Sequence, residues 1–417
     1  MRLLFQTQSG QGMGKHHPGL DKSSILIKII NMKNNDAPLN ETAFFTLSAQ
    51  DVCAATGISR ATLYAYVSRG IVRAIAHPGD GRKSLYDRRD MRKILSGKKR
   101  GRSRQSVAAS TIDWGEPILV SKITRIADGQ FYYRGKDAVV LSDAMTLEDA
   151  ARHLAGLRID ADRCAAPDFT PANHATPFDR MIAMMAGQVT GPTAGDGRPA
   201  AAKLMRLAAL AAAGIGDDGE SPIHVILARA WGAKSRSDAP ELLRRALVLC
   251  ADHELNASAY AVRVAASAGA SLPASLLAGL ATLSGTRHGG LTPRCRKWMD
   301  QVAKGKIDPA FDPVGNNVPP GFGHPLYPDG DPRTRAIMQS CGQTGDAFWA
   351  KIADQVGQAT GQHPSLDFGL ALLERELDLP KGAGLGIFAV GRMAGWIAHL
   401  LEQRQSGKII RPRAANG

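Results

Sequence analysis

ADHELNASAY, at Ala251–Tyr260, opens the part of the chain that decides the fold. It begins a series of six short segments, and each segment holds a His, Asp or Arg beside glycine or another small residue. Together they supply three imidazoles, one carboxylate and three guanidiniums, a set of groups suited to binding a small dicarboxylate and to proton chemistry beside it. The other five segments are SGTRHGG (Ser284–Gly290), PPGFGHPLYPDGDPRTRAI (Pro319–Ile337), SLDFGLALL (Ser365–Leu373), GRMAGWIAHLLEQ (Gly391–Gln403) and IIRPRA (Ile409–Ala414).

In order and in approximate spacing, these segments resemble the citrate synthase family over residues 113–417. The resemblance implies a mainly α-helical, two-domain fold, in which a small domain near residues 291–378 closes over substrate and excludes water. Helical periodicity dominates the chain after TLEDAARHL (Thr146–Leu154), and abundant Ala, Gly and Ser allow helices to pack closely. Before it, residues 116–141 alternate β-branched side chains around a D-G turn, which predicts strands.

The resemblance also assigns roles to side chains. Asp367 is the expected base for the methyl group of acetyl-CoA, since its apolar neighbours would raise its basicity. His288 would stabilise the enolate, and His324 would donate to the ketone oxygen of oxaloacetate. Taken singly, such residues are more often structural; the matching order of six segments favours the catalytic interpretation. The expected substrate-binding residues are His253, Arg333, Arg392, Arg411 and Phe388.

The implied reaction condenses acetyl-CoA with oxaloacetate and water to give citrate and CoA, with no cofactor and no metal. The implied assembly is a homodimer in which Arg411 reaches the partner's site. Two alternatives stay open: 2-methylcitrate synthesis from propionyl-CoA, and a DNA-binding regulator that senses a carboxylate or CoA ester. Residues 325–329 lack the basic residue that family members use for CoA phosphates, and Arg287 is a candidate to compensate for it.

A separate module precedes this region, at residues 45–96. Ser48 and Asp51 form a capping box for one helix, and Ser59 caps a second helix that Gly70 ends. The turn at residues 78–81 then predicts a β-hairpin, and a third helix follows from Asp87 through Leu95.

This module resembles the winged helix-turn-helix of MerR-type and excisionase-like proteins. Leu63, Tyr64 and Val67 are expected to face inward. The recognition helix and the wing would then present basic and polar side chains to DNA. The candidate DNA-binding residues are Arg60, Thr62, Tyr66, Arg69, Arg82 and Lys83.

Charge is unevenly distributed along the 417 residues. Residues 1–110 contain 19 Lys/Arg and 7 Asp/Glu, so +12 of the total +14 lies there. Such asymmetry favours a nucleic-acid partner, although solvated charge without a partner is the plainer interpretation. Residues 1–44, with Met32 as an alternative start, are expected to be a disordered extension, and 97–112 a basic linker.

Composition limits the remaining classes. The five cysteines are scattered without a CxxC pair, which favours free thiols in a reducing compartment. No run of about 18 apolar residues occurs, so we expect no membrane partner. The opening residues lack a signal-peptide core, and the expected location is the cytoplasm.

Overall fold

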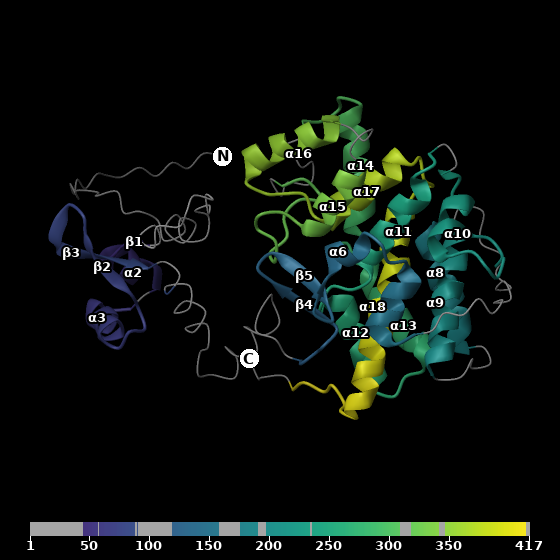
Figure 1. Cartoon of the computed structure of the whole chain (residues 1–417), viewed down its shortest axis with the longest axis horizontal. Coiled ribbons are helices and arrows are strands. Elements are labelled where there is room, and N and C mark those ends of the chain that lie inside the picture. The colour runs from purple at the N-terminus through teal and green to yellow at the C-terminus, as the bar shows by residue number, and fades with distance from the viewer. Residues whose placement is uncertain are drawn as a thin grey trace, which may run out of the picture. The chain divides into compact units, whose positions relative to one another are not determined.

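The computed structural model describes residues 45–87 without Gly57, then Asp90, and 119–413 without 158–175, 191–196, 234–235, 309–317 and 342–346. The chain divides into two compact units, one within residues 1–117 and one over Ile118–Arg413 (Figure 1). Four predictions lie outside the described residues: the extension over 1–44, the start at Met32, the end of the third helix and the linker over 97–112.

In residues 45–87, the N-terminal unit combines two short helices with a small antiparallel sheet. Ser48 N–H donates to Asp51 Oδ2 (3.0 Å), and Asp51 N–H donates to Ser48 Oγ (3.2 Å), which confirms the predicted capping box. Ser59 Oγ accepts the N–H of Thr62 at 3.1 Å and caps the second helix. The strand order is β1-β3-β2. The elements are β1 (Phe45–Ser48), α2 (Ala49–Thr56), α3 (Arg60–Ser68), β2 (Ala74–His77) and β3 (Asp80–Asp87).

The two tyrosines of α3 correct our expectation. Tyr64 is 55% exposed, whereas Tyr66 is half-buried and packs against the core of this unit. The reason is helical geometry: Tyr66 and Val67 lie three and four residues after buried Leu63 and share its face, whereas Tyr64 is turned about 100° away. The assignment of this unit to the winged helix-turn-helix class stays a prediction.

A three-stranded antiparallel sheet opens the C-terminal unit. Its strands are β4 (Thr124–Ala127), β5 (Gln130–Tyr133) and β6 (Lys136–Asp137), in that order. Asp128 and Gly129 both have positive φ (53° and 72°), as the predicted D-G hairpin turn requires. Tyr133 is fully buried, and its hydroxyl donates to Val248 O at 2.9 Å, so the sheet is fastened to the helical core.

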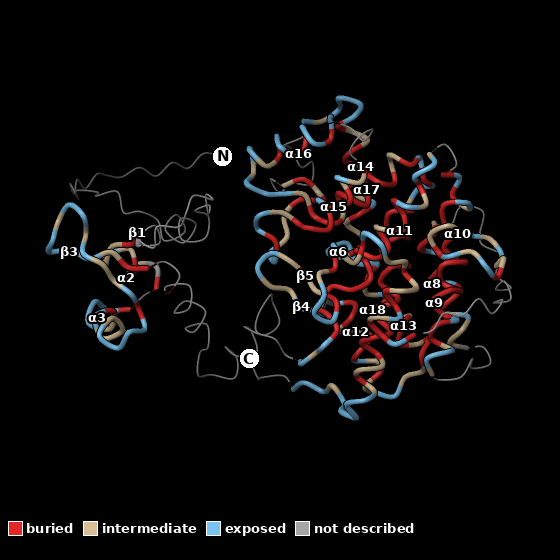
Figure 2. The backbone as a smooth tube through the Cα atoms, in the orientation of Figure 1, coloured by how far each residue is buried: buried red, intermediate tan, exposed pale blue. Residues whose placement is uncertain are grey.

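Helices form the rest of the described C-terminal unit. The long helix α18 packs against α7, α8, α9, α11, α12, α13, α14 and α17, and Figure 2 shows it as the buried centre of the unit. The helices are α6 (Ala138–Ser142), α7 (Leu147–Ala155), α8 (Pro177–Thr190), α9 (Arg198–Ala213), α10 (Ile223–Ala230), α11 (Ala239–Cys250), α12 (Ala257–Ser267), α13 (Leu272–Leu283), α14 (Leu291–Ala303), α15 (Pro332–Cys341), α16 (Ala347–Thr360), α17 (Leu366–Glu376) and α18 (Ala383–Ser406).

By length and apolar composition alone, α18 could cross a membrane. Within the unit, however, 94% of its most apolar window is buried against other helices. A central helix of a helical core is apolar on all sides for this reason.

A second, smaller hydrophobic core lies between α14, α16 and α17. Trp298, Trp349 and Phe368 are its largest fully buried side chains, and all its buried members fall within residues 295–372. The predicted small domain spans the same part of the sequence. Ile337 of α15 and Leu370 of α17 belong to the main core, however, so the two cores share helices. The domain boundary stays a prediction.

Candidate active site

The central helix α18 carries two of the predicted residues, Phe388 and Arg392, and both are buried. The guanidinium carbon of Arg392 lies 4.9 Å from the centre of the Phe388 ring. Arg392 Nε donates to Cys250 O at 2.8 Å, while Nη2 has no hydrogen-bond partner among the described residues. Burial lowers the pKa of Arg392, although Asp252 opposes this effect. A buried guanidinium with an unused donor is suited to binding an anion.

Two glycines let α18 approach the ADHELN segment closely. A Cβ at Gly391 would lie 2.6 Å from Leu247 O, and a Cβ at Gly395 would lie 2.3 Å from Asp252 Oδ1. The N–H of Gly395 donates to Ala251 O at 2.9 Å. Any larger side chain at these positions would push Arg392 away from the end of α11.

A series of buried polar contacts holds the ADHELN segment in place. Arg263 Nε donates to His399 Nδ1 (2.8 Å), so the proton of the neutral imidazole lies on Nε2, which is 3.3 Å from Asp252 Oδ1. The hydroxyl of Thr124 donates to Asp252 Oδ2 at 2.5 Å. These contacts fix the residue immediately before His253.

His253, His324 and Tyr327 form an aromatic cluster. The ring centres of the two histidines are 5.4 Å apart, and those of His324 and Tyr327 are 5.1 Å apart. His253 Nε2 and the hydroxyl of Tyr327 are 2.8 Å apart and share a hydrogen bond. The structure thus brings the first and third sequence segments together.

Arg333 lies beside this cluster, with its guanidinium carbon 5.6 Å from the centre of the Tyr327 ring. Its Nε and Nη2 donate to the two carboxylate oxygens of Asp331, at 2.9 and 2.7 Å. Burial opposes the charge on Arg333, but Asp331 nevertheless raises its pKa. Unlike Arg392, Arg333 therefore already has an acidic partner.

His288 is connected to the helical core through Ser258. His288 Nε2 is 2.9 Å from Ser258 Oγ, which also accepts the indole N–H of Trp396 at 3.2 Å. The Ser258 hydroxyl has one proton and two acceptors in reach, His288 Nε2 and Asn256 Oδ1 (2.7 Å). When it donates to Nε2, the neutral imidazole carries its own proton on Nδ1 and can donate from there.

Asp367 is the second residue of α17. The hydroxyl of Thr292 donates to its Oδ1 at 2.5 Å. Burial raises the pKa of Asp367 to about 6, and the bond from Thr292 and the charge of Arg333 limit this rise. Such a carboxylate is still ionised at neutral pH and is a stronger base than an exposed one.

The loop that carries His324 is joined to the start of α17. Ser365 N–H donates to Gly321 O, and Gly323 N–H donates to His363 O, both at 2.8 Å. Gly321 and Gly323 have positive φ (90° and 80°), which this looped backbone requires. These bonds couple His324 to the helix that positions Asp367.

The three histidines of the site are held neutral. Burial lowers the pKa of His288 and His324 to about 4, and the neighbouring arginines add to the effect. The pKa of His253 is also lowered, by burial first and then by Arg333. Neutral imidazoles can donate a hydrogen bond to a developing oxyanion without carrying a charge of their own.

Arg411 is the one predicted substrate-binding residue that no described contact joins to the others. It is exposed in the segment that follows α18. The neighbouring Ile410 N–H donates to Ser267 Oγ at 3.0 Å, so this segment is fastened to α12.

The six candidate DNA-binding residues differ in exposure. Arg60, Arg69, Arg82 and Lys83 are exposed. Thr62 and Tyr66 are only half exposed, and Thr62 Oγ1 lies 2.9 Å from Ser59 Oγ within the helix cap. Capping and core packing involve these two side chains, and the DNA-binding role of all six residues stays a prediction.

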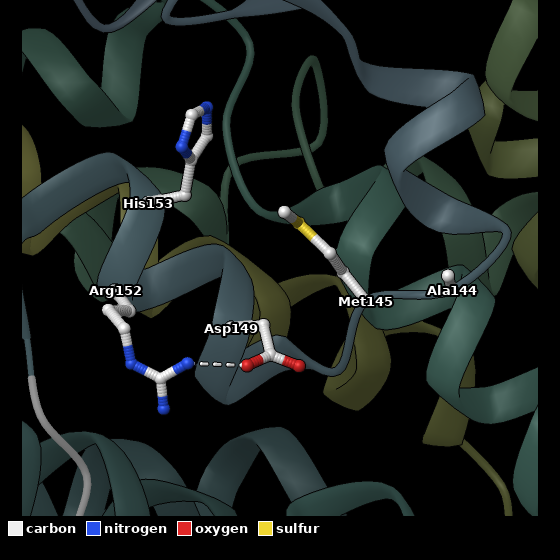
Figure 3. Close-up of a pocket in the computed structure, with 5 residues that line it drawn as sticks. All are labelled: Ala144, Met145, Asp149, Arg152 and His153. Atoms are coloured by element: carbon white, nitrogen blue, oxygen red, sulfur yellow. Dashed lines mark hydrogen bonds and ion pairs between the residues drawn. The ribbon is translucent and has the colours of Figure 1, made fainter.

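A surface hollow of about 490 Å³ lies elsewhere, against α7 (Figure 3). Of the residues that line it, Asp149 belongs to the capping box of α7 and pairs with Arg152 at 2.6 Å. His153 Nε2 is 3.0 Å from Tyr133 O. The polar groups of Asp149, Arg152 and His153 already contact neighbouring protein groups. None of the predicted site residues lines this hollow.

The sequence did not single out three residues that the structure places in the site. Ser258 and Tyr327 stand inside quoted segments, so their proximity to histidines was a usable signal. Thr292 follows the SGTRHGG segment and carries no signal of its own, because only the packing of α14 against α17 brings it to Asp367.

Comparisons with known proteins show which family this chain resembles. Residues 198–413 match the family model "Citrate synthase, C-terminal domain". Citrate synthase from Haloferax volcanii is 36% identical over 188 residues, which are 42% of this chain and 49% of that protein. The 2-methylcitrate synthase 2 of Corynebacterium glutamicum is 29% identical over 214 residues, 47% of this chain and 55% of that protein.

The fold is also found among solved structures. The ternary complex of citrate synthase from Thermoplasma acidophilum with carboxymethyl coenzyme A and oxaloacetate has a TM-score of 0.60 at 20% identity. It covers 74% of this chain and 95% of that one. The chain spans about half the length of the curated relatives it matches.

Proposed function

Because the chain belongs to the citrate synthase family, we propose that it condenses acetyl-CoA with oxaloacetate and, with water, releases citrate and CoA. One observation carries the proposal. The buried guanidinium of Arg392 has an unused donor, and it is grouped with neutral histidines and an aspartate whose pKa is raised to about 6. No cofactor is needed for this chemistry.

The proposed reaction begins at Asp367, which takes a proton from the methyl group of the thioester. His288 donates a hydrogen bond from Nδ1 to the enolate oxygen, which requires the Ser258 hydroxyl to turn its one proton from Asn256 Oδ1 to His288 Nε2. The enolate carbon then attacks the ketone of oxaloacetate, whose oxygen His324 polarises. The new alkoxide takes up a proton from solvent, and Asp367 releases to solvent the proton that it accepted, so the condensation is balanced. Water finally cleaves the citryl thioester: its hydroxyl joins the acyl carbon, and its other proton leaves with CoA as the thiol.

Arginines would bind the two carboxylates of oxaloacetate. Arg392 has a donor to offer, and His253 and Phe388 would border the same ligand. Arg333 already pairs with Asp331, so we expect it mainly to orient a carboxylate of oxaloacetate rather than to supply most of the binding free energy. The relative from Thermoplasma acidophilum binds oxaloacetate together with a CoA analogue, which supports this substrate class.

The acyl group is open between two substrates. A 2-methylcitrate synthase is among the relatives, and one extra methyl group changes binding by only about 1–3 kcal/mol. A thiol-release assay with oxaloacetate and either acetyl-CoA or propionyl-CoA separates the two activities. Absence of thiol release with both acyl-CoA substrates would contradict the proposed enzymatic activity and favour a sensor of carboxylates or CoA esters.

We also propose a homodimer in which Arg411 completes the partner's site. Its exposure, and its separation from the other site residues within one chain, support this role. Mixing Arg411→Ala with His288→Ala protein should restore activity, because a mixed dimer contains one site that carries neither change. Random exchange would restore roughly a quarter of the sites. Verified subunit exchange without recovery would contradict the shared site.

For the N-terminal unit, we propose binding to nucleic acid. Its support is the exposure of Arg60, Arg69, Arg82 and Lys83 and the net charge of +12 in the first 110 residues. Affinity should fall with salt, by a log–log slope of about −0.9 for each neutralised phosphate. A full-length protein without salt-sensitive DNA binding would contradict the proposal that the N-terminal unit binds nucleic acid.

A further inference from the structure

Thr292 and Asp367 occupy equivalent places on two packed helices. Each is the second residue of its helix, Thr292 on α14 and Asp367 on α17. Thr292 is fully buried, and its hydroxyl donates to Asp367 Oδ1 at 2.5 Å. The two positions are 75 residues apart in sequence, so the contact is a product of the fold.

The Thr292 side chain is held in place by its methyl group. A Cβ at Gly384 would lie 3.0 Å from Thr292 Cγ2, so the start of α18 packs tightly against that methyl. Because a β-branched side chain has few χ1 choices, fixing the methyl also fixes the hydroxyl. Threonine in a helix often bonds to its own backbone, but here the hydroxyl serves a carboxylate on another helix.

We infer that Thr292 is a positioning residue for the condensation proposed above: it holds Asp367 through Oδ1 and leaves Oδ2 to take the proton. The inference rests on the proposed function, because only a reacting carboxylate needs one oxygen held and the other free. An ionised carboxylate can accept hydrogen bonds on both oxygens, but the Thr292 hydroxyl has only one proton to donate. Thr292 therefore bonds to Oδ1 and does not bond to Oδ2.

The same bond stabilises the ionised form of Asp367, and this gives the inference a measurable consequence. Burial raises the pKa of Asp367 to about 6, and the bond from Thr292 is the strongest opposing influence. Among the described residues, Arg333, Asp331, Cys295 and Cys250 are charged or titratable groups that interact with Asp367. Burial raises the pKa of both thiols, so they are neutral, and Arg333 and Asp331 pair with each other.

Thr292→Val removes the hydroxyl and keeps the shape. Hydrogen bonds to charged groups are worth enough to move a pKa by about one unit. We therefore expect the pKa of Asp367 to rise by about one unit in this variant, and kcat to fall by about tenfold with little change in the KM for oxaloacetate. Thr292→Ser, which keeps the hydroxyl, should restore kcat to within about twofold.

Thr334→Val is the matched control. Thr334 is also buried, lies on α15 against Gly369 of α17, and its hydroxyl has no partner among the described residues. Its replacement should leave the pKa of Asp367 and kcat unchanged. An equal loss in both valine variants would mean that core packing, not the hydroxyl, is responsible, and would overturn the inference.

The pKa of Asp367 can be measured without turnover. Infrared difference spectra between each protein and its Asp367→Asn counterpart follow the carboxyl C=O band with pH. A folded Thr292→Val protein with an unchanged Asp367 pKa overturns the inference, and Thr292→Ala carries the same test if the valine variant does not fold. Absence of thiol release in the unmodified protein would reject the proposed function, whereas the infrared titration would still decide whether Thr292 controls the carboxylate.

Discussion

The two units of the chain use arginine in opposite ways. In the C-terminal unit Arg392 is 1% exposed and shares no hydrogen bond with a carboxylate among the described residues, whereas in the N-terminal unit Arg60, Arg69 and Arg82 are exposed. Burial of a charge costs free energy that only a partner or a ligand can offset, so a buried guanidinium with an unused donor indicates a binding site. An exposed guanidinium costs little and acts through screened, long-range attraction.

This contrast implies that catalysis should depend steeply on single buried groups and hardly at all on the N-terminal unit. The largest expected effect is that of Asp367→Asn, which removes the proposed base and keeps the shape of the side chain. General-base removal costs about 10²–10⁴ in rate, so thiol release should nearly vanish while oxaloacetate still binds, as calorimetry can check. Near-normal turnover would show that another group is the base.

Acidification should act on the same carboxylate without mutation. The pKa of Asp367 is raised to about 6 and only its ionised form is a base, so activity should fall as the pH drops through 6. The loss between pH 7 and pH 5 should be about tenfold. His288 and His324, with pKa near 4, remain neutral over this range. A pH–rate profile of kcat/KM that stays flat down to pH 4.5 would exclude Asp367 as the titrating group.

A smaller effect is expected from Tyr327→Phe. The change leaves His253 Nε2 buried without its 2.8 Å partner and so loosens an imidazole that we propose borders the ligand. Such a loss is on the order of 1 kcal/mol, which should raise the KM for oxaloacetate by about fivefold at similar kcat. Tyr132→Phe is the control, because the Tyr132 ring packs under Arg125, and its side chain lies on the opposite face of β5 from Phe131, whose ring contacts His253. Equal effects of both changes would remove Tyr327 from the site.

The smallest effect is expected from deletion of the N-terminal unit. A protein that starts near residue 110 retains every described residue of the site, and the hydrophobic core of the N-terminal unit is its own. Its kcat should stay within about twofold of the full-length value, while salt-sensitive DNA binding is lost. A truncated protein that folds and dimerises yet has no turnover would break the contrast between the two units.

Much of the fold could be predicted from local chemistry. The capping boxes at Ser48 and Thr146 and the D-G turn at Asp128–Gly129 are formed by residues at most three apart, so the sequence contains both partners. The prediction for α3 was wrong at Tyr64, although Leu63 was correctly expected to face inward. Residues three and four positions after Leu63 share its face of the helix, so helical spacing alone places Tyr66 inward and Tyr64 outward.

For the candidate site, too, some properties follow from the sequence and others only from the tertiary structure. By itself, the sequence determined the kinds of groups and their order, because six spaced segments name three histidines, an aspartate and three arginines. The tertiary structure alone decided which of them meet. Arg392 reaches Cys250 across 142 residues and Tyr327 reaches His253 across 74, while Arg411 stays apart within one chain. It also decided their ionisation, since a pKa shift depends on burial and on neighbouring charges, and both come from segments that are distant in the sequence.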